Sequence, residues 1–136
     1  MKKIMFTGHR DAKTSVKCLN EIAKRIPGAI WIHGGAKGFD MQVESYANEN
    51  GINTEIFKPD YKLGRAAPLI RNKQMVEKAD LLIACYDGRK SGGTNQAVLY
   101  AFNHGKSVFF VTCILENGEI IDKPNDWESL NSIAAR

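Results

Sequence analysis

Short apolar runs rich in β-branched and aromatic residues alternate along the chain with longer segments whose apolar positions recur every three or four residues. The short runs predict buried strands at residues 4–7, 29–33, 54–57, 80–85 and 107–111. The longer segments predict helices, and the apolar face of the first is formed by Val16, Leu19, Ile22, Ala23 and Ile26. This alternation predicts an α/β fold, a Rossmann-like three-layer sandwich in which a mainly parallel sheet of five strands, or slightly more, has helices on both faces.

The strand–helix steps all fall within residues 1–112, which we expect to form one Rossmann-like domain. Residues 113–136 are then a C-terminal extension that packs on the same domain. Asn117-Gly118 predicts a hairpin in this extension, and Trp127 and Leu130 predict a segment that docks back on the core.

The composition is that of a soluble globular protein, with 43% hydrophobic and 25% charged residues. No apolar run approaches the ~20 residues of a membrane-spanning helix. The segment before the first strand is too short for a signal peptide, so we expect a cytoplasmic protein without a membrane partner. The net charge of +4 suits an anionic ligand but forms no concentrated basic stripe. Cys18, Cys85 and Cys113 lack the spacing of a zinc site, so we expect buried thiols and no metal.

Three polar loops follow three of the predicted strands. They are Gly8-His9-Arg10-Asp11, Gly34-Gly35-Ala36-Lys37-Gly38-Phe39-Asp40 and the segment from Asp87 to Gln96. Because every strand-to-helix loop of a parallel sheet emerges at the carboxyl edge, we expect these loops to lie along one rim.

The second and third of these loops are rich in glycine and each opens a helix. Glycine lets an anion approach backbone N–H groups, and a helix N-terminus adds unpaired N–H donors and a partial positive charge. Either loop alone is equally consistent with a tight turn, but together they favour a phosphate-binding rim. The candidate ligand-binding residues are Gly8, His9, Arg10, Gly34, Gly35, Ala36, Lys37, Gly38, Asp40, Arg71, Asn72, Asp87, Gly88, Ser91, Gly92, Gly93, Thr94 and Asn95.

Several of these residues also have a structural interpretation. Arg71 could reach a phosphate or pair with a surface carboxylate, and Asp40 could cap a helix or bind a ribose hydroxyl. Asp87 could bind the ligand or serve only to shape a turn with Gly88. The chain contains neither a P-loop nor a complete dinucleotide-binding glycine motif, which argues against an ordinary ATPase or dehydrogenase.

The ordered motifs resemble a bacterial and phage family of the SLOG superfamily, which also includes the DNA-processing protein DprA/Smf and the Lonely Guy enzymes. The motifs that carry the resemblance are Gly34 to Asp40, Ala66-Ala67-Pro68-Leu69-Ile70-Arg71-Asn72-Lys73-Gln74-Met75, Asp87-Gly88 and Ser91-Gly92-Gly93-Thr94. The resemblance covers roughly residues 1–112 and implies a Rossmann-like fold that binds nucleotides or their derivatives.

The resemblance to Lonely Guy enzymes also bears on catalysis. Ser91 to Thr94 parallels their phosphate loop in shortened form, and Arg71 with Met75 parallels their arginine helix. Where those enzymes have a catalytic glutamate, this chain has Asn95-Gln96-Ala97, and glutamine cannot act as a general base. The candidate catalytic residues are Arg71, Asp40, Asp87 and Gln96.

Three functions follow, in order of preference. The first is binding, or sensing, of a nucleotide or nucleotide-derived phosphate ligand, with no other cofactor expected. The second is phosphoribohydrolase cleavage of the N-glycosidic bond of a nucleoside monophosphate. The third is binding of single-stranded DNA, as the resemblance to DprA implies. The relatives further imply a homo-oligomer.

Overall fold

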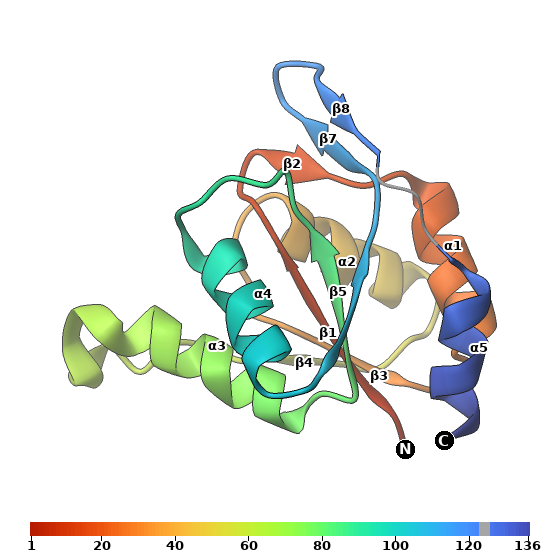
Figure 1. The fold of residues 1–136 in the computed structure, drawn as a ribbon, viewed down its shortest axis with the longest axis horizontal. Coiled ribbons are helices and arrows are strands. Elements are labelled where there is room, and N and C mark those ends of the chain that lie inside the picture. The colour runs from red at the N-terminus through yellow and green to blue at the C-terminus, as the bar shows by residue number, and fades with distance from the viewer. Residues whose placement is uncertain (123–125) are drawn as a thin grey trace.

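The computed structural model describes residues 1–122 and 126–136 and has a five-stranded, all-parallel sheet at its centre (Figure 1). The strand order is β4 (Thr54–Ile56), β3 (Ile30–His33), β1 (Lys3–Gly8), β5 (Leu81–Cys85) and β6 (Ser107–Phe110). The predicted Rossmann-like α/β fold is therefore confirmed, and the more polar third strand, β4, lies at an edge.

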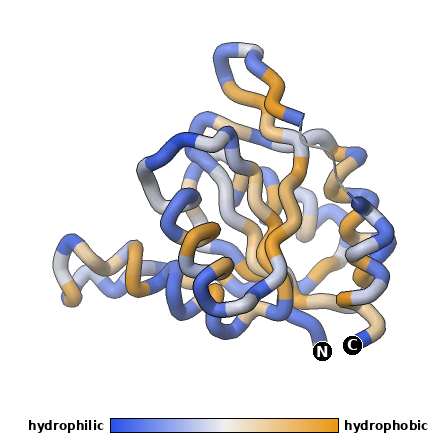
Figure 2. Tube along the Cα trace, viewed as in Figure 1, coloured by the Kyte–Doolittle hydropathy of each residue, from blue (hydrophilic) through white to orange (hydrophobic). Residues whose placement is uncertain are grey.

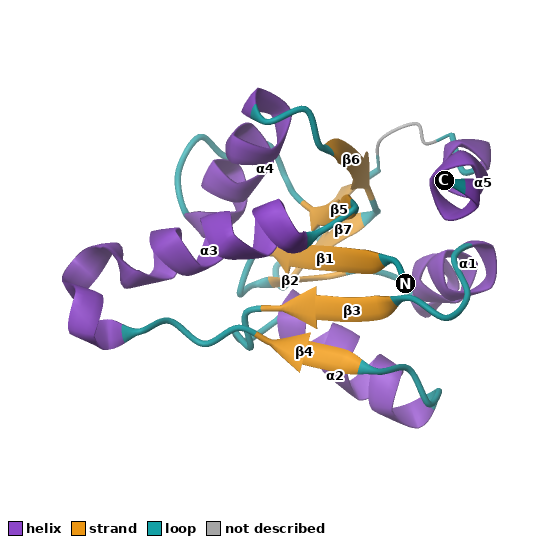
Figure 3. Ribbon diagram, turned by 90° about the horizontal axis from the view of Figure 1, so that it is seen from below, coloured by secondary structure: helices purple, strands orange, loops and turns teal. Residues whose placement is uncertain are grey.

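Helices cover both faces of this sheet (Figure 3). One face packs against α1 (Val16–Arg25) and α2 (Phe39–Glu49) through a core centred on Phe6, Trp31 and Leu19. The other face packs against α3 (Ala67–Lys78) and α4 (Gly93–Asn103). Alternate strand residues point to opposite faces, so β1 contributes Phe6 to the first core and Met5 to the second.

One detail of the predicted helix faces is wrong. Val16 was expected on the buried face of α1, but it is 60% exposed. It is the first residue of the helix, whereas Cys18, Leu19 and Ile22 lie further along the helix and are buried. Periodicity defines the direction of a helix face but not where the protein surface ends along it.

In the C-terminal segment, β7 (Cys113–Leu115) and β8 (Ile120–Ile121) form a small antiparallel sheet with β2 (Ala12–Lys13) from the loop after β1. The hairpin predicted around Asn117-Gly118 is present as β7 and β8, and it projects from the body as two apolar strands joined by a polar turn (Figure 2). Strand β2 is too short to leave a periodic signal. Helix α5 (Glu128–Ala135) buries Leu130 and packs against α1.

The chain order places a crevice at the carboxyl end of the sheet. Strand β1 lies beside both β3 and β5, with Gly8 opposite Cys85. The helices that follow β1 and β5 lie on opposite faces, so the loops after these strands diverge and leave space between them. A 3₁₀ segment, η1 (Tyr61–Ala66), leads into α3 beside this rim. None of the helices in the described ranges has the length and apolarity needed to cross a membrane.

Candidate functional site

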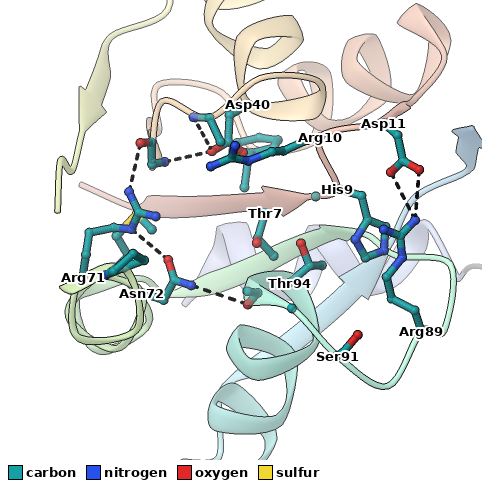
Figure 4. Close-up of a pocket in the computed structure, with 18 of the residues that line it drawn as sticks. Thr7, His9, Arg10, Asp11, Asp40, Arg71, Asn72, Arg89, Ser91 and Thr94 are labelled. Carbon is teal, nitrogen blue, oxygen red and sulfur yellow. Dashed lines mark hydrogen bonds and ion pairs between the residues drawn. The ribbon is translucent and has the colours of Figure 1, made fainter. Parts of the chain in front are cut away.

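A cavity of about 640 Å³ opens at the carboxyl edge, where the loops after β1, β3 and β5 meet the first turns of α3 and α4 (Figure 4). Its polar lining divides into an amide-rich wall, an arginine wall, an acidic glycine loop and an ion-pair network. The lining residues are Phe6, Thr7, Gly8, His9, Arg10, Asp11, Gly34, Ala36, Asp40, Pro68, Arg71, Asn72, Met75, Arg89, Ser91, Gly92, Gly93, Thr94 and Glu116.

The first turn of α4 forms the amide-rich wall. The backbone N–H groups of Gly93, Thr94 and Asn95 find no acceptor among the described residues, and no side chain caps the helix. The Thr94 side chain is only 5% exposed, and its hydroxyl has no partner in the described part of the chain. An uncapped helix N-terminus that borders a cavity is suited to bind an anion.

Arg71, at the start of the second turn of α3, forms the adjoining wall. Its Nη1 donates to the carbonyl oxygens of Gly34 at 3.0 Å and Phe57 at 2.9 Å, and its Nε donates to Asn72 Oδ1 at 2.8 Å. A Cβ at Gly34 would lie 2.6 Å from Arg71 Nη1, so glycine is required for this approach. Burial lowers the pKa of Arg71, an effect that the nearby Asp40 carboxylate opposes. Nη2 is left with no bond to the described residues.

The Gly34–Gly38 loop differs from a phosphate loop because the N–H groups of Gly34, Gly35 and Ala36 are already bonded to side chains. Asp40 Oδ2 accepts from the amides of Gly34 and Ala36, each at 3.2 Å, and His33 Nδ1 accepts from the amide of Gly35 at 3.0 Å. His33 is fully buried, and its other ring nitrogen lies 2.7 Å from Glu44 Oε1. The part of the loop that lines the cavity, Gly34 and Ala36, therefore has no free amide, and Asp40 lines the cavity beside it.

An ion-pair network ties the loop after β1 to the loop after β5. Arg89 donates from Nε and Nη2 to both carboxylate oxygens of Asp87 at 2.8–3.0 Å, and from Nη2 to Asp11 Oδ1 at 3.1 Å. The Arg89 guanidinium lowers the pKa of Asp87 to about 2. His9 Nε2 lies 3.0 Å from Asp87 Oδ1. Burial, with the charge of Arg89, lowers the pKa of His9 and keeps its ring neutral at pH 7.

This network predicts an acid-dependent contribution to stability. Because the folded-state pKa of Asp87 lies below its usual 3.8, the contribution is present above that pH and is lost as the pH falls towards 2. An Arg89→Met variant is therefore expected to be less stable than the wild type at neutral pH and nearly equal to it near pH 2. Denaturant unfolding across this range measures the difference, with Lys90→Met as the control for losing a neighbouring cation. A difference that stays constant with pH would contradict the assignment.

The cavity brings together most of the sequence-predicted ligand-binding residues. Those in its lining are Gly8, His9, Arg10, Gly34, Ala36, Asp40, Arg71, Asn72, Ser91, Gly92, Gly93 and Thr94. Those outside it are Gly35, Lys37, Gly38, Asp87, Gly88 and Asn95. Gln96, a candidate catalytic residue, lies in a separate groove between α3 and α4. Within the described ranges, no cluster of His, Cys, Asp or Glu has the arrangement of a metal site.

Sequence reasoning missed two kinds of lining residue. The uncharged ones are Phe6, Thr7, Pro68 and Met75, of which Pro68 and Met75 lie in a quoted motif but were not predicted to bind the ligand, and the charged ones are Asp11, Arg89 and Glu116. Asp11 and Arg89 belong to the loops that the sequence singled out, and the Asp87-x-Arg89 spacing was an available signal for an ion pair. Glu116 comes from the β7–β8 hairpin, and only tertiary pairing with β2 brings it to the cavity.

A comparison with family models gives a match for the first part of the chain. Residues 2–64, from β1 through β4 and into η1, match the model described as the YspA, cpYpsA-related SLOG family. The match covers a little less than half of the chain and shows that this segment is similar in sequence to that SLOG family. The resemblance indicated by the glycine motifs is therefore confirmed, and it includes two of the three loops that meet at the cavity. No curated protein matches the chain.

Two solved structures have a similar fold. The X-ray structure of TM1055, a structural genomics target, matches with a TM-score of 0.59 and 22% identity over 79% of this chain and 72% of that chain. The X-ray structure of DNA processing protein A (DprA) from Streptococcus pneumoniae matches with a TM-score of 0.62 and 19% identity. That match covers 81% of this chain but 50% of DprA, so this chain spans half of that protein's length. At these identities the likeness establishes the fold and no ligand.

Proposed function

We propose that the cavity binds a nucleotide or nucleotide-derived ligand through its phosphate group, which occupies the N-terminus of α4. The observation that carries the proposal is the set of free N–H groups at Gly93, Thr94 and Asn95, on a helix that opens onto the cavity beside Arg71. The aligned peptide dipoles of a helix favour an anion at this end, and its unpaired donors supply the hydrogen bonds.

The charges around the cavity support an anionic ligand. Arg10 forms no ion pair with the described residues, and Arg71 bonds only to neutral groups. Arg89, in contrast, is already paired with Asp87 and Asp11. Two cationic side chains are thus available to a phosphate. The cavity volume of about 640 Å³ falls within the range of small-molecule sites, and the similarity of the segment that supplies two of its loops to a SLOG family agrees with a nucleotide-related role.

A hydrolytic function is the second candidate, and one observation favours it. Asp40 lines the cavity, and burial raises the pKa of its carboxyl group, as suits a residue that transfers protons. Of the other candidate catalytic residues, Asp87 is paired with Arg89 and Gln96 lies in another groove. Asp40 is therefore the predicted carboxyl group that lines the cavity and could take part in cleavage. Chromatography of AMP after prolonged incubation decides the matter: free adenine and ribose 5-phosphate would establish cleavage, and intact AMP would exclude this substrate.

Phosphate binding at α4 is tested by Thr94→Val, which keeps the side-chain shape and removes the hydroxyl. We expect it to weaken AMP binding about tenfold, because a hydrogen bond to a charged group contributes roughly 1.5–3 kcal/mol. The measurement is the shift of the thermal midpoint with AMP concentration, since a ligand of the folded state raises that midpoint.

Thr14→Val is the matched control for this substitution, because Thr14 is also buried but lies outside the cavity lining. It should leave AMP binding unchanged. If the wild type responds to none of inorganic phosphate, AMP, ADP, ATP, NAD or ADP-ribose, the proposal fails. Salt-sensitive retention of single-stranded DNA would then favour a nucleic-acid ligand.

A further inference from the structure

Burying the charged Asp40 side chain costs free energy, and the hydrogen bonds that it accepts from the loop do not need a charged group. It is 6% exposed and forms no ion pair within the described ranges. Oδ2 accepts both loop amides, whereas Oδ1 is buried without any hydrogen-bond partner. An asparagine could accept the same amides through its single carbonyl oxygen and avoid the cost of burying a charge. A buried acceptor left without a donor calls for a role other than shaping the loop.

Asp40 lies across the cavity from the proposed phosphate site. A chain of hydrogen bonds leads from Asp40 through the Gly34 amide and carbonyl to Arg71, then to Asn72, whose Nδ2 lies 3.5 Å from the Gly93 carbonyl oxygen (Figure 4). One end of this chain is a carboxylate and the other is the N-terminus of α4. The wall formed by the N-terminus of α4 therefore suits a negatively charged group, and the wall formed by Asp40 suits a hydrogen-bond donor.

A phosphate is unsuited to the Asp40 wall for two reasons. The amides of Gly34, Gly35 and Ala36 are already bonded to side chains, and the carboxylate would repel an anion. A hydroxyl group suits this wall, because it can donate to the acceptor that lacks a partner. Burial raises the pKa of Asp40, which agrees with a carboxylate that has too few donors.

We propose that Asp40 Oδ1 accepts a hydrogen bond from a sugar hydroxyl of the ligand, so that the site selects phosphate esters of ribose over deoxygenated analogues. This inference rests on the proposed function, since it assumes that the phosphate lies at α4. In a nucleotide the sugar adjoins the phosphate, so its hydroxyls can face one wall while the phosphate occupies the other.

The test compares affinities by isothermal titration for inorganic phosphate, ribose 5-phosphate, AMP and 2′,3′-dideoxyAMP. The wild type is expected to bind AMP about tenfold more tightly than 2′,3′-dideoxyAMP, as for one hydrogen bond to a charged acceptor. In Asp40→Asn this preference should fall to within about twofold, because the charged acceptor is replaced by an amide. Affinity for inorganic phosphate should stay the same or rise, since a nearby negative charge has been removed.

Two measurements separate recognition from a purely structural role. Asp40→Asn is expected to melt at or above the wild-type temperature, whereas a carboxylate needed only to shape the loop would lower that temperature when replaced. Glu44→Gln is the matched control, because it weakens the support of the same loop through His33 from outside the cavity. It should keep the preference for AMP over its dideoxy analogue.

Each failure has a distinct meaning. Equal wild-type affinity for AMP and 2′,3′-dideoxyAMP would overturn the role of Asp40 while leaving phosphate binding intact. An undiminished preference in Asp40→Asn would do the same. If no phosphate compound binds, both this inference and the proposed function fail. Should Asp40→Asn not fold, the wild-type preference decides alone, and its expected loss on acidification through the raised pKa of Asp40 provides the second readout.

Discussion

Replacing Gly38 with alanine is expected to destabilise the protein by about 3 kcal/mol or more, from backbone strain combined with overpacking. Gly38 has φ +78°, and a Cβ there would lie 2.4 Å from the carbonyl oxygen of Arg10 and 2.6 Å from that of His9. These atoms belong to backbone, so no side-chain rotation can relieve the contact. The loop after β1 and the start of α2 would have to separate, which opens the junction behind the cavity.

Gly28→Ala is the control for this substitution. Gly28 has a similar φ of +75°, but a Cβ there would meet nothing within 4 Å. It should therefore cost only about 1 kcal/mol, the strain of a left-handed non-glycine residue. Denaturant unfolding of both variants measures the difference. Equal losses would show that backbone conformation, and not the contact with the Arg10 and His9 carbonyls, determines the cost at Gly38.

Replacing Arg71 with methionine is expected to weaken AMP binding about 10- to 100-fold, as for the loss of a charged hydrogen-bond donor. Methionine keeps much of the alkyl volume and removes the guanidinium. The same change leaves the carbonyl oxygens of Gly34 and Phe57 without this donor, so we also expect a stability loss of about 1–2 kcal/mol. Binding and stability must therefore be measured separately, by titration calorimetry and by denaturant unfolding.

Two further variants test whether binding depends on the Arg71 guanidinium group or only on a positive charge on α3. Arg71→Lys keeps the positive charge but cannot reproduce the planar fork, so it should recover only part of the affinity. Lys73→Met removes a cation from the same helix, where it lies over the Tyr100 ring outside the cavity lining, and should leave AMP affinity unchanged. Unaltered affinity in Arg71→Met would remove this side chain from the binding site and leave it a structural link between α3 and the ends of β3 and β4.

The sequence determined the order of strands and helices and the edge of the sheet at which the candidate binding residues lie. Apolar runs such as Leu81–Cys85 are buried on both faces, and this burial is recorded locally in residue type and spacing. The glycine loops follow these runs directly, so the parallel topology was sufficient to place them on one rim. The uncapped start of α4 was not foreseeable in the same way, because Thr94 offers a hydroxyl that could cap a helix, whereas the helix begins one residue earlier with Gly92 at its N-cap.

Only the tertiary structure decided how each loop uses its polar groups. The two glycine loops look alike in sequence and each begins a helix without a side-chain cap, yet the amides of Gly34 and Ala36, which line the cavity, are occupied by Asp40, while those of Gly93 and Thr94 are free. Whether a donor is free depends on partners that folding brings within about 3 Å, and side-chain order along the chain does not encode that distance. The same reason explains why Glu116, contributed by a hairpin distant in sequence, was not predicted to line the cavity.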